Sequence, residues 1–198
     1  YRDGKGVRRS GRQAERWYRA AMEDMSLMDG GPTAACSLGL MYERGDGVRK
    51  DLEEAKKLYT MAHEAGEREA TYNLGCLFEG QSGPAPAVPN LAKAAELYLQ
   101  AAKAGQIRSQ HNLGCCHFLG KGVEKDLAKA KAWWVKAAKQ GQAEGMYALA
   151  VLLDDEGDEA WPARVALYRA AAEKGDTMAR EQRPRMEEHI RSFCANCF

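Results

Sequence analysis

Six cysteines and four histidines are the residues of this chain that could do redox or metal chemistry. Two of them form Cys194-x-x-Cys197 near the end of the sequence. Such a pair is typical of a thiol–disulfide couple or of half a zinc site, and it also arises by chance. His189 is the nearest nitrogen ligand, so another chain or a continuation would have to complete a tetrahedral set. The sequence therefore predicts no metal site and no bound cofactor.

The histidines do not form a catalytic pattern either. They are scattered along the sequence, at His63, His111, His117 and His189. The sequence carries no recognisable nucleophile motif, phosphate loop or His-Glu-x-x-His motif. His117 stands where other repeats have an aromatic residue, which favours a place in the core. We therefore expect a protein that is not an enzyme and has no small-molecule substrate.

The segments that carry these residues are repeated. A Leu-Gly pair, or Leu-Ala in the last copy, recurs at spacings of 36, 39 and 36 residues: Leu38-Gly39, Leu74-Gly75, Leu113-Gly114 and Leu149-Ala150. An alanine-rich block follows each pair and ends in a glycine: Gly66, Gly105, Gly141 and Gly175. Self-similarity at this period predicts a solenoid of stacked helical hairpins.

The unit 34–66 displays the pattern most clearly. An apolar stripe at helical spacing predicts a first helix, and Gly45 and Gly47 predict a tight turn after it. Asp51 has the position of an N-cap for a second helix, which Gly66 ends in the left-handed conformation. The alanines of the second helix predict close packing, with burial of Ala62 and its counterparts Ala101, Ala137 and Ala171.

The same pattern divides the whole chain. Repeats are expected at 34–66, 70–105, 109–141 and 145–175, after a half repeat with a connector at 1–33 and before a capping helix and tail at 176–198. The turns are expected near 43–50, 79–89, 119–125 and 155–162. Structural roles are predicted for Gly39, Gly75, Gly114, Gly120, Gly122, Asn90 and Asp126. Asp176 is expected to cap the last helix and Pro184 to kink it.

The spaced pattern Ala-x3-Leu-Gly-x2-Tyr, Gly-x-Gly-Val-x2-Asp, Ala-x3-Tyr-x2-Ala-x3-Gly closely resembles the Sel1-like repeat, a relative of the tetratricopeptide repeat. The resemblance covers nearly the whole chain up to Gly175. It implies an all-α fold, an α/α right-handed superhelix, acting as an adaptor or scaffold in protein complexes. A cysteine-rich bacterial branch of the family pairs the two helices of each repeat by a disulfide, and that cysteine arrangement is absent here.

The other four cysteines lie on predicted first helices, at Cys36, Cys76, Cys115 and Cys116. Equivalent residues of neighbouring repeats should lie about 8–10 Å apart, the usual distance between packed helices. A disulfide needs Cα atoms within about 7 Å. We therefore expect free thiols, which favour a reducing environment. Because the sequence does not begin with Met, a trimmed mitochondrial or other organellar protein stays open.

The charge balance argues against a nucleic-acid partner, because the formal net charge is only +1. No segment has the roughly 20 apolar residues needed to cross a bilayer, so no membrane insertion is expected. Seven cations cluster near the start: Arg2, Lys5, Arg8, Arg9, Arg12, Arg16 and Arg19. They fit a solvated end of the solenoid or a docking site for an acidic partner.

Residues beside the core stripe of the first helices are the candidate binding surface. The predicted binding residues are Tyr72, Cys76, His111, Cys115, Phe118, Tyr147 and Val151, in register with Cys36, Leu40, Glu43, Glu79 and Asp154. Facing the inside of a superhelix, they would suit an extended or helical segment of another protein. The alternative is that these positions simply complete the core.

Two further functions stay open. The chain could be an architectural subunit of a large complex, which exposed Trp17, Trp133 or Trp161 would favour. A cysteine-dependent assembly factor is a third possibility, against which the lack of a repeated cysteine pair counts. The leading hypothesis is a non-catalytic scaffold that binds other proteins.

Overall fold

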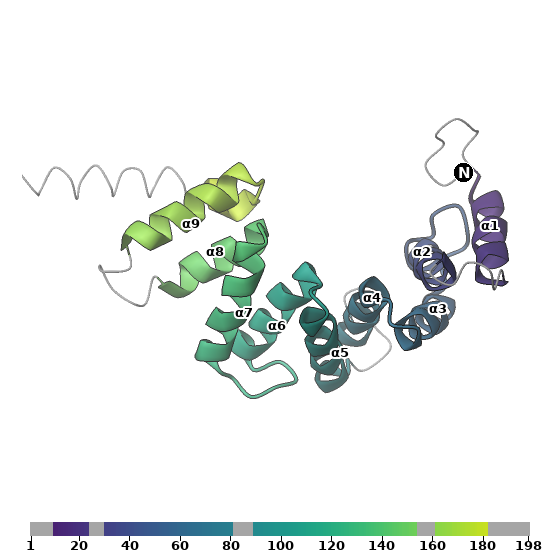
Figure 1. Ribbon diagram of the computed structural model, residues 1–198, viewed down its shortest axis with the longest axis horizontal. Helices are drawn as coiled ribbons and strands as arrows, with labels where there is room; N and C mark the ends of the chain where they lie inside the picture. The colour runs from purple at the N-terminus through teal and green to yellow at the C-terminus, as the bar shows by residue number, and fades with distance from the viewer. Residues whose placement is uncertain (1–9, 24–29, 81–88, 154–160, 182–198) are drawn as a thin grey trace, which may run out of the picture. The chain divides into compact units, whose positions relative to one another are not determined.

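Consecutive α-helices form the part of the chain that the computed structural model describes, residues 10–23, 30–80, 89–153 and 161–181 (Figure 1). Within these ranges there is no β-strand, and the all-α expectation is confirmed. The helices are α1 Gly11–Glu23, α2 Gly30–Arg44, α3 Leu52–Glu64, α4 Arg68–Glu79, α5 Leu91–Lys103, α6 Ile107–Leu119, α7 Leu127–Lys139, α8 Ala143–Leu152 and α9 Trp161–Glu173. A last helical stretch covers 177–181.

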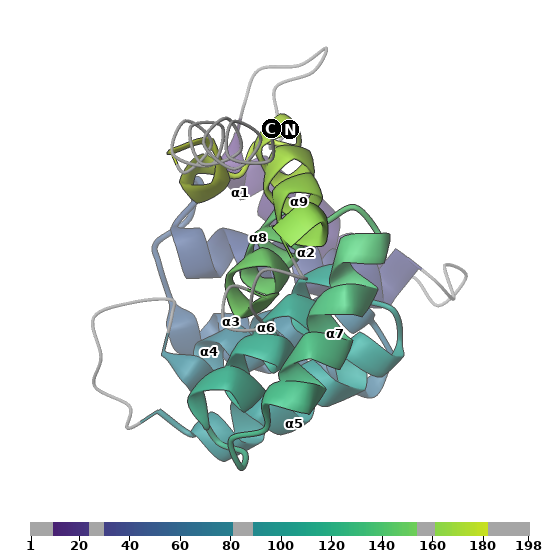
Figure 2. The same cartoon turned by 90° about the vertical axis from the view of Figure 1, so that its left-hand side faces the viewer.

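The chain forms two compact units, Tyr1–Gln106 and Ile107–Phe198. In unit 1, α2 pairs with α3 and α4 with α5, while α1 packs on α2 and α3 on α4. In unit 2, α6 pairs with α7 and α8 with α9, while α7 packs on α8. Neighbouring helices within each unit lie side by side in both views (Figures 1 and 2). Each helix therefore buries its apolar stripe against its sequence neighbours, as stacked hairpins do.

The turns inside the hairpins follow the glycine pattern. Gly45 and Gly47 have φ of 77° and 75°, and Gly120 and Gly122 have 71° and 69°, all in the left-handed region. The cap residue after each turn is also tied to the first helix through its backbone. The N–H of Asp51, Asn90 and Asp126 donates to the carbonyl oxygen of Tyr42, Phe78 and His117, at 2.9–3.0 Å.

The three predicted N-caps are confirmed. The Asp51 carboxylate accepts from the N–H groups of Glu53 and Glu54 at 3.1 and 3.0 Å. The Asn90 and Asp126 side chains accept from the N–H groups of Lys93 and Lys129 at 3.0 and 2.9 Å. These bonds satisfy donors that a helix N-terminus leaves open.

The buried alanines of the second helices also take part in the hydrogen bonds that end those helices. Ala62, Ala101, Ala137 and Ala171 are at most 1% exposed, as predicted. Their carbonyl oxygens accept from the N–H groups of Glu67, Gln106, Gln142 and Asp176, each of which follows a left-handed glycine. This is the 6→1 bond of a Schellman motif. One alanine position therefore provides both close packing and the helix end.

Some boundaries differ from the expected ones. Helix α2 begins at Gly30, four residues before the expected boundary at 34. Pro32 is tolerated there because the first turn of a helix has no intrahelical partner for its N–H groups. Helix α9 likewise begins at Trp161, inside the expected turn 155–162.

Asp176 caps the last helical stretch, because its carboxylate accepts from the Ala179 N–H at 2.7 Å. Pro184, Cys194, Cys197 and the proline-rich segment 81–88 lie outside the described residues. No helix in the described ranges has the length and apolar character to pass through a membrane.

Candidate interaction surface

An aromatic ring of the second helix lies across a glycine of the first helix in three repeats. A Cβ atom added to Gly39 would lie 2.8 Å from Cε1 of Tyr59, and one added to Gly75 would lie 2.7 Å from Cε1 of Tyr98. At Gly114 the clash, with the Trp134 indole, would be closer still. The glycine of the Leu-Gly pair is therefore needed for the close approach of a ring. Tyr59 and Tyr98 are 0% exposed and Trp134 is 4% exposed.

In unit 1 these rings are tied to carboxylates near the end of the first helix. The Tyr59 hydroxyl donates to Glu43 Oε2 at 2.6 Å, and the Tyr98 hydroxyl donates to Glu79 Oε2 at 2.7 Å. Burial raises the pKa of both tyrosines, and the carboxylates raise it further. Both phenols therefore stay protonated and act as donors that fasten the second helix to the first.

In unit 2 the residue that stands in place of the glutamate is apolar. Trp134 replaces the tyrosine, and its Nε1–H donates to the His111 carbonyl oxygen at 3.1 Å. Phe118 occupies the position of the glutamates, and its ring centroid lies 5.5 Å from that of Trp134. Because the indole nitrogen is already bonded, a carboxylate at position 118 would lack the phenol donor that Glu43 and Glu79 have.

The predicted binding residues of unit 1, Tyr72 and Cys76, and Cys36 in register with them differ in exposure. Cys36 and Cys76 are only 7% and 8% exposed. The Tyr98 hydroxyl lies 3.5 Å from Cys76 Sγ, and burial raises the pKa of that thiol. Tyr72 is half-buried, with its ring centroid 6.0 Å from that of Tyr98. Of the three, Tyr72 therefore offers most surface.

The predicted binding residues of unit 2 are more open. Cys115, Phe118 and Tyr147 are half-buried, and Val151 is 38% exposed. The Tyr147 ring lies edge-on to Tyr168, with centroids 5.6 Å apart. The side chains of α6 and α8 therefore leave apolar surface accessible on the first helices of this unit. Asp154, the last position of the predicted set, lies outside the described residues.

His111 is held against both the core and a thiol. Its ring stacks on Trp134 with centroids 6.5 Å apart, and its Nε2 lies 3.5 Å from Cys115 Sγ. Burial lowers the pKa of His111, while the carboxylates of Glu144 and Asp176 raise it more weakly. The neutral imidazole is therefore the favoured form in the folded unit.

His117 is half-buried, as are Tyr42 and Phe78 at the same position of other repeats. It lies in the last turn of α6, with its Nδ1 3.4 Å from the Glu124 carbonyl oxygen. The adjoining turn therefore supplies a polar partner for the ring. Cys36, Cys76, Cys115 and Cys116 are not joined by disulfides. Within the described ranges, no three side chains of the metal-binding types converge as a metal site requires.

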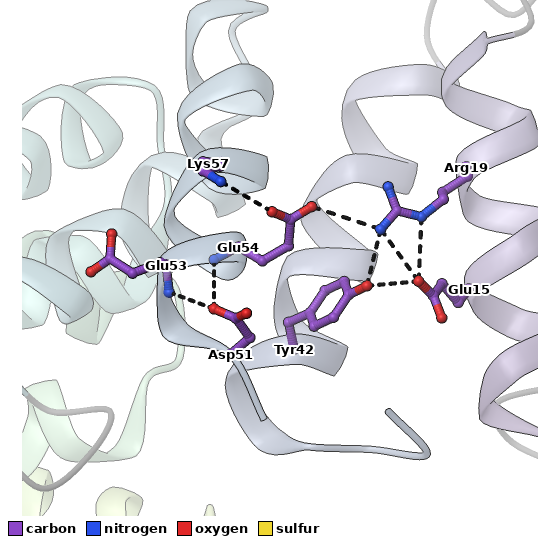
Figure 3. A network of polar contacts seen from close by, with 7 residues as sticks. All are labelled: Glu15, Arg19, Tyr42, Asp51, Glu53, Glu54 and Lys57. Atoms are coloured by element: carbon purple, nitrogen blue, oxygen red, sulfur yellow. Dashed lines mark hydrogen bonds and ion pairs between the residues drawn. The ribbon is translucent and has the colours of Figure 1, made fainter. Parts of the chain in front are cut away.

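A polar network that the sequence did not predict joins α1 to the first hairpin (Figure 3). The Tyr42 hydroxyl donates to Glu15 Oε1 at 2.6 Å and accepts from Arg19 Nη2 at 3.0 Å. Arg19 also pairs with Glu15 at 3.3 Å and with Glu54 at 3.7 Å. The hydrogen bond to Tyr42 is the main cause of the raised pKa of Arg19. This member of the cationic cluster therefore has a structural partner.

The tryptophans of the second helices are placed differently. Trp17 on α1 is 62% exposed. Trp133 on α7 is half-buried and lies under the Lys136 ammonium, 4.0 Å from the ring centroid. The Trp161 side chain lies outside the described part of the chain.

Solved structures similar to this chain come from several bacteria. A Sel1 repeat protein from Oxalobacter formigenes is 29% identical, with a TM-score of 0.77, over 89% of this chain and 70% of the other. A protective antigen of uropathogenic Escherichia coli is 26% identical, with a TM-score of 0.75, over 88% of this chain. The match spans only 36% of that antigen. An immunity protein from Pseudomonas aeruginosa, at 22% identity and a TM-score of 0.54, shares the fold alone.

No curated protein matches the chain. The model of the Sel1 repeat matches residues 1–23, 32–67, 68–106, 107–142 and 165–176, which together make up most of the sequence. The match is shortest where the fourth expected repeat has lost its double-glycine turn. The chain therefore belongs to the Sel1 repeat family.

Proposed function

We propose that this protein is a non-catalytic scaffold that binds peptide or protein segments on the exposed side of its first helices. Sel1 repeats generally mediate protein–protein interaction, and proteins built from them are typically scaffolds without catalytic activity. Each unit has its own proposed surface. In unit 1 it is formed by Tyr72 on α4, and in unit 2 by Cys115 and Phe118 on α6 with Tyr147 and Val151 on α8. Cys76 is buried beside the Tyr98 hydroxyl, and the half-buried His111 ring stacks on Trp134.

The observation that carries the proposal is the way three half-buried rings are held. Tyr72, Phe118 and Tyr147 each lie 5.5–6.0 Å, centroid to centroid, from an aromatic ring of the paired second helix. Their partners are Tyr98, Trp134 and Tyr168. A ring held in this way contributes contact area to a partner with little further loss of conformational freedom. Such rigid aromatic groups are the usual anchors of protein interfaces.

The test compares first-helix and second-helix aromatics in the full-length protein. Partners captured by tagged protein are identified by mass spectrometry, and their recovery is then measured for Tyr72→Ala, Tyr147→Ala and the matched control Trp133→Ala. We expect the first two variants to lose at least about 80% of a captured partner, a difference of roughly 1 kcal/mol. The control should retain it. Equal recovery with all three variants would refute this surface.

A second candidate, an architectural subunit of a multiprotein complex, is favoured by one observation. Trp17 is 62% exposed on a second helix, whereas its counterparts Leu58 and Leu97 are 3% and 1% exposed. A large exposed ring of this kind suits a permanent contact. This function would be favoured over the first if Trp17→Ala prevented assembly of the complex. Tyr72→Ala and Tyr147→Ala should then assemble normally.

A further inference from the structure

A hollow of about 870 Å³ lies in unit 1, at the side where α3 begins and α4 ends. Its apolar wall is made by Leu52, Leu77 and Phe78, with Pro89 at one end. Leu77 and Phe78 are half-buried, so part of each side chain is open to the hollow. The space is large enough to hold an apolar side chain of a bound peptide.

Three cations line the same hollow. Arg49, Lys50 and Lys56 line the hollow, and the Lys56 ammonium lies 5.2 Å from the centre of the Phe78 ring. Arg49 also lines an adjoining hollow of about 380 Å³, which it shares with Arg12 of α1. Arg49 and Asp51 line both hollows, so the two hollows adjoin along one edge of unit 1.

The carboxylates along the same edge are largely engaged within the protein. Asp51 accepts two backbone hydrogen bonds as the N-cap of α3. Glu15 is bonded to Tyr42 and Arg19 (Figure 3). Among the described residues, Glu53 is the one further acid that lines either hollow, and it is exposed. Positive charge therefore exceeds negative charge along this edge.

We propose that this edge binds an acidic, extended peptide segment that carries one large apolar side chain. The apolar side chain would lie on Leu77 and Phe78, and carboxylates on either side of it would pair with Arg49 and Lys56. Charge complementarity favours an acidic partner, because three cations and two acids line the larger hollow, and one of those acids, Asp51, already accepts backbone hydrogen bonds as an N-cap. This surface differs from the first-helix face of the proposed scaffold, so each can be disproved separately.

Unit 2 contains a natural comparison for the key cation. Its turn Gly120-Lys121-Gly122-Val123-Glu124 matches Gly45-Asp46-Gly47-Val48-Arg49, and Glu124 stands where unit 1 has Arg49. Both turns have left-handed glycines and both precede a capping aspartate. Arg49→Glu therefore places in unit 1 a residue that the same turn already accommodates in unit 2.

The test measures fluorescence anisotropy of three labelled peptides with the full chain: EEEFEEE, EEEGEEE and KKKFKKK. We expect EEEFEEE to bind, with an affinity that falls as salt is raised. EEEGEEE should bind roughly ten-fold more weakly because it lacks the apolar anchor. KKKFKKK should show no binding. Arg49→Glu and Lys56→Glu should each weaken EEEFEEE binding roughly five-fold, while Glu124→Arg leaves it unchanged.

Melting curves of the variants should match that of the natural chain, so that loss of binding is not loss of fold. Three outcomes would overturn the proposal. The first is that EEEFEEE does not bind at millimolar protein concentration. The second is that EEEFEEE and KKKFKKK bind equally well. The third is that Arg49→Glu leaves the affinity for EEEFEEE unchanged. Variants at Tyr72 and Tyr147 should leave the affinity for EEEFEEE unchanged, which separates this surface from the first-helix face.

Discussion

The two units pack the same helical hairpin with different chemistry at the point where a ring crosses a glycine. In unit 1, Tyr59 and Tyr98 each donate a hydrogen bond to a glutamate. In unit 2, Trp134 donates to a backbone carbonyl group, and Phe118 lies against its ring. The features common to both units are the glycine and the buried ring. The residue that closes the contact can therefore be polar or apolar without changing the hairpin.

The two units also differ in the side chains that their first helices expose. In unit 1 the cysteine beside the ring, Cys76, is buried, and the glutamates are engaged by tyrosines. In unit 2, Cys115 and Phe118 are half-buried and Val151 is 38% exposed. Unit 2 therefore presents the more apolar first-helix face, whereas unit 1 presents the cationic edge at Arg49. The repeats share a fold and differ in the partners that they suit.

The largest expected effect comes from filling the space under the rings. Gly114→Ala should lower the free energy of unfolding by about 3 kcal/mol and Gly75→Ala by about 2 kcal/mol, because each added methyl group meets a buried ring. Gly31→Ala is the control, since its Cβ atom would have no neighbour closer than 3.8 Å. Urea unfolding measures all three. Equal stability of Gly114→Ala and Gly31→Ala would contradict the role of the glycine.

The buried alanines should affect the two units alike. Ala101→Leu in α5 and Ala137→Leu in α7 should each cost about 2 kcal/mol, because both alanines are at most 1% exposed. Ala92→Leu and Ala132→Leu change exposed positions of the same two helices and should cost less than about 0.5 kcal/mol. Thermal unfolding compares the four variants. A large difference between Ala101→Leu and Ala137→Leu would show that helix packing differs between the units.

Removing the phenol should separate the polar contact from the apolar one. Tyr98→Phe should cost about 1–2 kcal/mol, because Glu79 loses the hydrogen bond from the Tyr98 hydroxyl. Phe118→Leu in unit 2 keeps an apolar group and should cost less than about 1.5 kcal/mol. In Glu79→Gln, an amide oxygen can still accept from Tyr98, so most of the stability should remain. If Tyr98→Phe were as stable as the natural chain, the Tyr–Glu contact would have no structural role.

The smallest expected effect is the pH dependence of the free energy of unfolding that His111 of unit 2 causes. Burial lowers the pKa of His111 in the folded protein, so the unfolded chain takes up its proton first as the pH falls. The stability that His111 contributes is therefore complete above its unfolded pKa of about 6.5 and is lost as the pH falls below it. Between pH 7.5 and 5.5, the His111→Gln variant should therefore lose less stability than the natural chain. An unchanged loss of stability over this pH range in His111→Gln would contradict this prediction.

Local signals predicted most of the fold. Caps such as Asp51 and helix ends such as Gly66 depend on residues within one or two turns of the chain, so the sequence displays them directly. Pro32 fits the first turn of a helix, so α2 begins before the expected boundary. The repeat period predicted which helices pair, since each hairpin packs on its neighbours.

Contacts between helices were harder to predict. The glycine–aromatic contact depends on the distance between two helices, which no local pattern contains. A signal exists, because the aromatic follows the glycine by 20 residues in Gly39–Tyr59 and Gly114–Trp134, and by 23 in Gly75–Tyr98, where the loop is longer. The network of Glu15, Arg19 and Tyr42 had no such repeated spacing. The binding residues that the sequence suggested remain a proposal.

Site-specific photocrosslinking tests the proposed first-helix surface most directly. A photoreactive phenylalanine analogue is placed at Tyr72 and Tyr147 on first helices, and at Trp17 and Trp133 on second helices, in the full-length protein inside its native cells. The proposed scaffold predicts partner adducts from positions 72 and 147 and few from 17 and 133. Adducts from 17 or 133 alone would contradict it.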